Sequence, residues 1–247
     1  MNQRRCTLVL SGLVVGMAVF LLLRMPIISG TWTKQTLYLW LQNSWHLQKS
    51  DRQPMIMLID DDSGDGVFAI HQICEEIGIK ATFAIIPSRL SSVLSDSLKS
   101  WQQEGHGIAL HGFDHARWND WSTDAVTDDI SRCEHLLTRL GFKPTFQYVV
   151  PPHGCNTAAI RKAIKAKNYQ MVTLASIVNP DNSLFQLGRI MISKNSDMKE
   201  MERLLVKARK ERGFVILGTH SSMPDEFSKD KTKTVLKQAL NLGYKFV

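Results

Sequence analysis

Short apolar runs alternate with amphipathic segments along most of the chain. Each run of four to six mostly apolar residues predicts a buried strand, and each segment with apolar residues three or four positions apart predicts a helix. Strands are expected at residues 55–59, 82–86, 107–110, 146–150, 170–174, 187–192, 214–218 and 244–247. Helices are expected at residues 67–77, 94–104, 123–140, 157–167, 197–212 and 232–242. This alternation predicts an α/β fold with a parallel sheet, either open or closed into a barrel.

The first thirty residues have a different pattern. Arg4 and Arg5 precede an uncharged stretch from Thr7 to Leu23, and Arg24 follows it. Basic residues before an apolar stretch indicate a signal sequence whose amino end stays in the cytoplasm. No clear cleavage site follows, so we predict an uncleaved membrane anchor, in preference to a cleaved signal peptide or a buried core helix.

Three segments result from these patterns. Residues 1–30 are the expected signal anchor, residues 31–53 a linker, and residues 54–247 one domain of catalytic size. The protein is therefore expected in the cell membrane as a single-pass protein with its domain on the extracytoplasmic side. If the amino-terminal segment is cleaved, the domain is secreted instead.

Charge and cysteine content exclude some classes of protein. The 247 residues have a formal charge of +7, but the basic residues are scattered and no nucleic-acid-binding motif accompanies them. We therefore expect no nucleic-acid partner. Of the four cysteines, Cys6 precedes the apolar stretch, and the other three have no Cys-x-x-Cys spacing. This pattern predicts neither a disulfide framework nor a structural zinc site.

Reactive side chains follow several of the expected strands directly. Asp60, Asp61 and Asp62 follow the strand at 55–59, and an unpaired carboxylate is too costly to bury. His111 and His115 follow the strand at 107–110 with a spacing that allows both to bind one metal ion.

Two later strands end in the same way. Pro151-Pro152-His153-Gly154 follows the strand at 146–150, and His220 follows the strand at 214–218. Each group alone is typical of an ordinary turn or loop, but in α/β barrels the carboxyl ends of the strands are where active sites are built. A carboxylate and two histidines suit a divalent cation, and a further carboxylate and histidine suit a base and an acid. Together they predict metal-assisted hydrolysis.

The order and spacing of these residues resemble the polysaccharide deacetylases that have a NodB-homology domain (carbohydrate esterase family 4). Leu58-Ile-Asp-Asp-Asp62 occupies the place of the family's Thr-Phe-Asp-Asp-Gly motif, and Ala81-Thr-Phe-Ala84 resembles its next strand. His111 to His115 matches the His-x-x-x-His motif. Val150-Pro-Pro-His-Gly154 corresponds to the Arg-x-Pro-aromatic-Gly motif, and Leu217-Gly-Thr-His220 is similar to the late Leu-x-His motif.

The resemblance implies a distorted (β/α) barrel and a role for each matching residue. Asp61, His111 and His115 would bind a divalent metal ion, expected to be Zn²⁺. Asp60 would take a proton from the attacking water, and His220 would protonate the departing amine.

The third motif would contact the substrate. Pro152, His153 and Gly154 would line the acetyl group, where the metal and a backbone N–H stabilise the oxyanion.

Two departures from the family pattern affect these roles. Val150 stands where the family has an arginine that orients the base, and Arg189 is a candidate to replace it. Asp62 stands where the family has glycine, so the base and the metal ligand are either Asp60 and Asp61 or Asp61 and Asp62.

The expected function follows from the resemblance. The chain is expected to be a hydrolase of non-peptide carbon–nitrogen bonds, a carbohydrate de-N-acetylase that acts on an N-acetylated polysaccharide of the cell envelope. Two alternatives stay open: a catalytically silent glycan-binding barrel, which the loss of the family arginine at Val150 favours, and a related amide or ester hydrolase.

Overall fold

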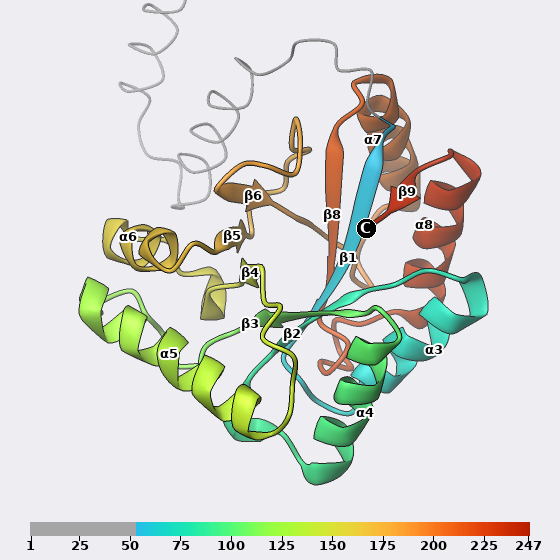
Figure 1. Ribbon diagram of the computed structural model, residues 1–247. Coiled ribbons are helices and arrows are strands. Elements are labelled where there is room, and N and C mark those ends of the chain that lie inside the picture. The colour runs from blue at the N-terminus through green and yellow to red at the C-terminus, as the bar shows by residue number, and fades with distance from the viewer. Residues whose placement is uncertain (1–52) are drawn as a thin grey trace, which may run out of the picture. The chain divides into compact units, whose positions relative to one another are not determined.

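The computed structural model describes residues 53–247 (Figure 1). The expected anchor at 1–30 and nearly all of the expected linker at 31–53 lie outside the described residues. Among the helices within 53–247, none combines the length and apolar character needed to cross a membrane.

Nine strands form one sheet, and the strand pairs in it are parallel. Their order is β6-β5-β4-β3-β2-β1-β8-β7, with β9 added beside β1. The strands are β1 (Met55–Asp61), β2 (Thr82–Ile85), β3 (Gly107–Leu110), β4 (Tyr148–Val149), β5 (Gln170–Thr173), β6 (Gln186–Gly188), β7 (Ile190–Met191), β8 (Phe214–Thr219) and β9 (Lys245–Phe246).

One segment joins the two ends of this order. β6 pairs with β5 and β7 pairs with β8, yet only Arg189 separates β6 from β7 in the chain. The segment 186–191 therefore nearly closes the sheet into a ring of parallel strands, and at Arg189 its hydrogen-bonded neighbour changes from β5 to β8. The predicted (β/α) barrel is confirmed, and its distortion lies at this residue.

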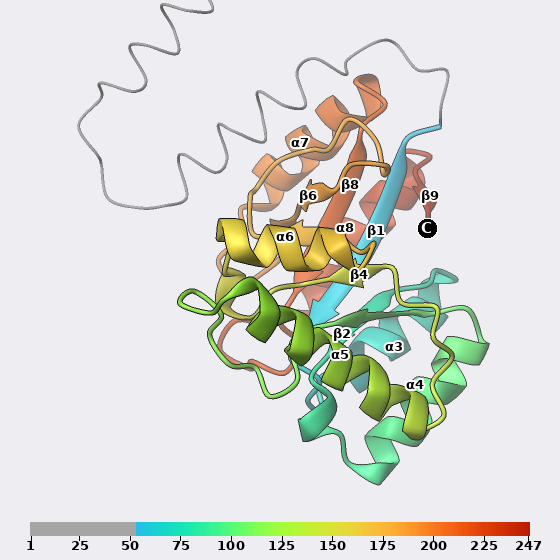
Figure 2. The ribbon, with the colours of Figure 1, turned by 60° about the vertical axis from the view of Figure 1, so that its left-hand side comes forward.

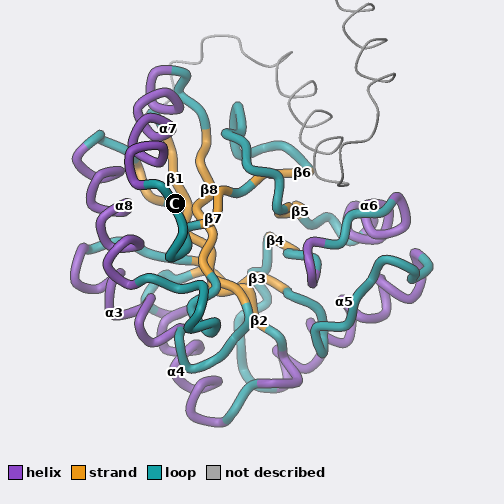
Figure 3. The backbone as a smooth tube through the Cα atoms, turned by 180° about the vertical axis from the view of Figure 1, so that it is seen from behind, coloured by secondary structure: helices purple, strands orange, loops and turns teal. Residues whose placement is uncertain are grey.

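Helices follow the strands and lie outside them (Figures 1 and 3). They are α3 (Val67–Ile77), α4 (Ser92–Gln103), α5 (Thr123–Arg139), α6 (Ala158–Ala166), α7 (Met198–Lys210) and α8 (Lys229–Asn241), with short 3-10 turns η1 (Pro87–Arg89) and η2 (Pro152–Gly154). Figure 2 shows α4, α5, α6 and α7 one after another along one side of the strands. Serine, threonine or aspartate side chains cap five of the helices at their amino ends.

The alternation along β1 separates two apolar cores. Ile56 and Leu58 belong to a large core shared with the helices. Met57 and Ile59 belong to a smaller core that takes buried residues from six neighbouring strands and their ends and none from a helix: Ala84, Ala109, Val150, Val172, Leu187, Phe214 and Ile216. The smaller core is therefore the filled interior of the barrel.

The observed bounds agree closely with the expected ones, and the differences have a local cause. β1 extends two residues past Ile59 because Asp60 and Asp61 remain in register with β8 and β2. The expected strand at 187–192 is divided at Arg189, because the residues before it pair with β5 and those after it pair with β8. The expected strand at 146–150 is reduced to two residues, since Pro151 follows it and has no N–H to continue a ladder.

Candidate active site

The two histidines of the expected metal site lie in the loop after β3. His111 is buried, and its Nδ1 lies 2.6 Å from the carbonyl oxygen of Val150. Only a protonated Nδ1 can hydrogen-bond to a carbonyl, so Nε2 keeps its lone pair free for a cation. Gly112 permits the loop to turn here, because its φ is +74° and a Cβ would lie 2.6 Å from Pro152 Cγ.

The carboxylate that meets these histidines belongs to Asp62. Its Oδ1 lies 3.3 Å from His111 Nε2 and 3.2 Å from His115 Nε2, and the three ligand atoms fall within 4.8 Å of one another. Asp62 Oδ1 is buried without a hydrogen-bond partner. Asp62 and His115 have φ angles of +77° and +65°, a strain that native structures retain mainly at functional sites.

These donors fit a divalent cation. Burial, together with the neighbouring His111, lowers the pKa of His115 to about 4, so the imidazole is neutral near pH 7, as a metal ligand must be. Burial would raise the pKa of Asp62, but the hydrogen bond and charge of His111 outweigh it and lower that pKa. Two imidazoles and one carboxylate suit Zn²⁺ and similar ions.

Asp61 occupies the mouth of the barrel. It lies on the same face of β1 as Met57 and Ile59, and it is fully buried. Arg189 Nη1 lies 2.7 Å from its Oδ1 and 2.5 Å from its Oδ2, and His220 Nε2 lies 3.4 Å from Oδ2.

The side chains around Asp61 determine its charge. Burial alone would raise the pKa of Asp61, but Arg189, His111 and His220 outweigh burial and hold it well below its usual range. Asp61 is therefore an ionised carboxylate at neutral pH, held between a guanidinium and an imidazole.

Asp60 faces the opposite side of β1. It accepts hydrogen bonds from Thr219 Oγ1 at 2.6 Å, Ser221 N at 2.9 Å and Ser221 Oγ at 2.5 Å. These donors flank His220, so Asp60 fixes the position of the loop that carries it. Burial raises the pKa of Asp60 to about 7 even though these three hydrogen bonds favour the charged form.

His220 is held between two carboxylates. Its Nε2 faces Asp61, and its Nδ1 lies 3.0 Å from Glu226 Oε2. Burial disfavours a charged imidazole, but Asp61 and Glu226 together raise the pKa of His220 to about 9. The ring is therefore protonated at neutral pH.

The turn expected to contact substrate lies beside the histidines. The His153 ring is 4.3 Å from the His115 ring, and His153 Nε2 lies 3.0 Å from the carbonyl oxygen of His115. The N–H of Gly154 donates to Pro151 O at 3.2 Å, within the turn itself. Pro152 is buried and His153 is exposed, so His153 is the side chain of this turn that reaches solvent next to the cluster.

The sequence left two pairings of base and metal ligand open, Asp60 with Asp61 or Asp61 with Asp62. The observed contacts agree with the second pairing. The first pairing made Asp61 the ligand and Asp60 the base, whereas Asp62 is the acid grouped with both histidines and Asp61 is the acid beside His220. The reason is the two-residue period of a strand: β1 continues through Asp61, so Asp60 points to the helix side.

Two residues at the site had no place in the sequence argument. Glu226 contacts His220 from six positions along the chain, and no motif marks it. Asp129 accepts a hydrogen bond at 2.8 Å from the N–H of Phe113, inside the histidine loop. Asp129 was detectable, because it is an acid within the otherwise apolar stripe of α5 formed by Val126, Ile130 and Cys133.

Comparison with solved structures shows the same fold. A family 4 acetyl xylan esterase from Clostridium thermocellum, in complex with a cobalt ion, has 15% identity and a TM-score of 0.60, covering 78% of this chain and 87% of that one. PdaA of Bacillus subtilis, a family 4 carbohydrate esterase, has 15% identity and a TM-score of 0.58, covering 88% and 86%. A family 4 pseudoenzyme of Bacillus anthracis has 12% identity and a TM-score of 0.54, covering 80% and 64%.

These structural likenesses show the fold alone, and the family of the chain is shown by a family model. No curated protein matches this chain. The model of the polysaccharide deacetylase family matches residues 48–172, which is half of the chain and includes the acids of β1, the histidine loop and the turn after β4. The chain therefore belongs to the polysaccharide deacetylase family, whose members are hydrolases that act on carbon–nitrogen bonds of N-acetylated carbohydrates.

Proposed function

We propose that this protein is a metal-dependent de-N-acetylase of a cell-envelope polysaccharide. The observation that carries the proposal is the environment of Asp61, an ionised carboxylate between Arg189 and His220 and next to the cation ligands of the rim. In this proposal Asp61 is the base, His220 is the acid, and the metal ligands lie beside them at one end of the barrel.

Asp62, His111 and His115 would hold the cation. When bound, a divalent ion of this kind polarises a carbonyl and makes a water molecule more acidic. The two imidazoles and the unpartnered carboxylate oxygen favour Zn²⁺ among the candidate ions.

Asp61 acts as the base. It is charged at neutral pH, and its Oδ2 lies 2.5 Å from Arg189 Nη1 and 3.4 Å from His220 Nε2, where it would take a proton from the attacking water. Arg189 contacts both oxygens and keeps the carboxylate oriented, which is the role that the family arginine replaced by Val150 would have.

His220 acts as the acid. Its imidazole is protonated at neutral pH and reaches the same oxygen of Asp61, so it can donate to the amine nitrogen as the acetyl carbon–nitrogen bond breaks. Glu226 and the loop contacts of Asp60 hold the ring in this position.

The polymer would enter beside the turn Pro152–Gly154. His153 is exposed there and packs on His115, so a sugar ring next to the acetyl group would meet His153 first. The apolar stretch from Thr7 to Leu23, preceded by Arg4 and Arg5, supports a membrane-anchored or secreted location, which would expose the site to envelope polysaccharide.

The test is release of acetate from N-acetylated glycan oligomers by the full chain loaded with zinc. Turnover is expected in the wild type and in Asp65→Asn, an exposed acid close to the site that serves as a matched control. Asp62→Asn is expected to lose both bound metal and acetate release.

The outcomes distinguish the alternatives. No acetate release from any N-acetylated glycan, with metal demonstrably bound, would contradict the proposal, and glycan binding without turnover would identify a silent barrel. Release from O-acetylated substrates alone would identify an esterase instead.

A further inference from the structure

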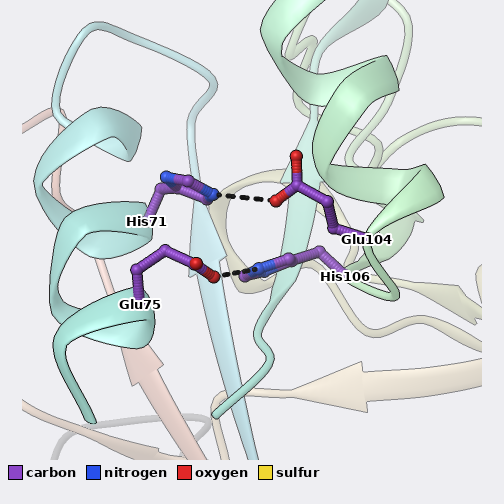
Figure 4. A group of neighbouring side chains, drawn as sticks. All are labelled: His71, Glu75, Glu104 and His106. Atoms are coloured by element: carbon purple, nitrogen blue, oxygen red, sulfur yellow. Dashed lines mark ion pairs between the residues drawn. The ribbon is translucent and has the colours of Figure 1, made fainter. Parts of the chain in front are cut away.

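A second group of metal-ligating side chains lies far from the rim. His71 and Glu75 project from α3, while Glu104 and His106 come from the turn between α4 and β3 (Figure 4). This turn precedes β3, whose opposite end carries His111. The group is therefore at the amino-terminal end of the strands, opposite the candidate active site.

The four side chains point toward one another, as Figure 4 shows. One ligand atom from each residue falls within 4.8 Å of the other three. His71 Nε2 lies 3.5 Å from Glu104 Oε2, and His106 Nε2 lies 3.7 Å from Glu75 Oε1. Both distances exceed those of ordinary hydrogen bonds, and the two imidazole Nε2 atoms are buried without a hydrogen-bond partner.

Helix geometry and packing hold the group in place. His71 and Glu75 are four residues apart, so they lie on one face of α3. The His71 ring stacks on Trp101 of α4 with a centroid distance of 4.1 Å and an interplanar angle of 10°. The imidazole is therefore oriented before any ligand arrives, which reduces the entropy lost on binding.

His106 has a different role from His71, Glu75 and Glu104. The N–H of Ala81 donates to His106 Nδ1 at 3.3 Å, so Nδ1 carries a lone pair and the ring hydrogen is on Nε2. Such an Nε2–H faces Glu75 Oε1 at 3.7 Å, would donate to it once the carboxylate moves onto an ion, and is not itself a metal ligand. Hydrogen bonds of this kind orient ligating carboxylates in metal sites.

The surface side of the group gives access from solvent. The side chains of Glu75 and Glu104 are about half exposed, at 50% and 42%, whereas the His106 side chain is 0% exposed. Lys80 Nζ lies 3.1 Å from Glu75 Oε1 and is itself 42% exposed, so its ammonium competes for this carboxylate and is free to move away.

We infer that this group is a second site for a divalent transition-metal ion, with His71 Nε2, Glu75 and Glu104 as ligands and His106 orienting Glu75. One imidazole and two carboxylates suit Zn²⁺, Co²⁺ or Mn²⁺. The ion would join α3 to the turn that begins β3. Its role is structural, because the site faces away from the barrel mouth and lacks a base and an acid of the kind that Asp61 and His220 provide.

The experiment measures bound Co²⁺ per full chain by equilibrium dialysis followed by metal analysis. The wild type is expected to hold about two ions and Glu104→Gln about one, since the amide removes the ligand charge. His111→Ala should also retain about one ion, and the double variant none. Glu76→Gln is the matched control, because Glu76 lies next to Glu75 but pairs with Lys233 outside the group, and it should hold two.

Lys80→Gln tests the competition at Glu75. Removing the ammonium is expected to tighten Co²⁺ binding at this site several-fold, measured in the His111→Ala background so that the rim does not contribute. Glu104 is exposed and Glu104→Gln is isosteric, so a folding defect is not expected, and circular dichroism checks this. No ion in His111→Ala, an unchanged number of ions in Glu104→Gln, or an unchanged affinity in Lys80→Gln would overturn the inference.

Discussion

Asp60 and Asp61 are neighbours in the chain and are both buried, but they face opposite sides of β1 and have different partners. Asp61 faces a guanidinium and an imidazole, and Asp60 faces two hydroxyls and one backbone N–H. These surroundings lower the pKa of Asp61, whereas burial raises that of Asp60 to about 7. A one-residue step along a strand therefore separates the proposed base from a residue that positions the His220 loop.

Substitution of each acid by asparagine distinguishes these roles. Asp61→Asn removes the proton acceptor without removing a proposed metal ligand, so kcat should fall about 10²- to 10⁴-fold with metal still bound. Asp60→Asn keeps a hydrogen-bonding side chain in its pocket and should lower kcat much less. Single-turnover acetate release with metal analysis measures both. A larger loss in Asp60→Asn would return the base to Asp60.

The charge of His220 predicts a pH dependence. Because its pKa is raised to about 9, the imidazole is protonated below that pH, and activity should fall as the pH rises through it. Glu226 is one cause of the raised pKa, so Glu226→Gln should move this alkaline limb to lower pH. The shift should be less than about one unit, since a half-exposed ion pair contributes at most about 1 kcal/mol.

The pH profile of kcat for the wild type and Glu226→Gln checks this prediction. Glu211→Gln is a suitable control, because Glu211 is an exposed acid on a different element and pairs with Lys207. An alkaline limb that does not move in Glu226→Gln would separate His220 from the ionisation that limits the rate.

At the scale of elements, the break between β6 and β7 is the feature on which the site depends. β6 pairs with β5 and β7 pairs with β8, and Arg189 lies between β6 and β7. This residue is 2% exposed and reaches Asp61 at the barrel mouth. Val150, in the interior core after β4, occupies the motif position at which the family has arginine. We therefore expect Arg189 to supply, from a different strand end, the positive charge that the family pattern places at position 150.

Moving the arginine from position 189 to position 150 tests whether either position can supply the charge beside Asp61. Arg189→Met leaves Asp61 buried without its guanidinium and should cost about 3–5 kcal/mol of stability and most of the activity. Val150→Arg alone adds a second cation and extra volume to a filled interior, and should destabilise by about 1–3 kcal/mol. The double variant should recover part of kcat relative to Arg189→Met.

Chemical denaturation and acetate release measure the two effects in all three variants. A double variant no more active than Arg189→Met would show that an arginine at position 150 cannot replace Arg189.

At the scale of the whole domain, ligands from separate strand ends depend on one another. Asp62 follows β1 and the two histidines follow β3, so a cation at the rim would join loops held apart by β2. A ligand that binds only the folded state stabilises it, by about 2.7 kcal/mol at a concentration 100 times its Kd. Removal of metal with a chelator should therefore lower the Tm by roughly 5–10 °C for a domain of this size.

Thermal unfolding with and without chelator measures this shift, and added zinc should reverse it. His111→Ala should show a smaller shift, because only the proposed site at His71 would remain. A Tm that is unaffected by chelator in the wild type would contradict metal binding at both sites.

The sequence by itself was sufficient for the order of strands and helices and for which strand ends carry reactive side chains. Hydrophobic periodicity is a local property, so α3 and β3 have the bounds expected of them. The family resemblance, too, rests on short motifs whose residues are close in the chain.

Only the tertiary structure decided which atoms meet. Whether Asp60 or Asp61 faces the barrel interior depends on how far β1 continues in register with β2 and β8, and the sequence of β1 alone does not contain that information. The contacts of Asp61 with Arg189, and of Asp60 with Ser221, span 128 and 161 residues. Such pairs exist because barrel closure brings strand ends together, and closure is a property of the whole ring of strands.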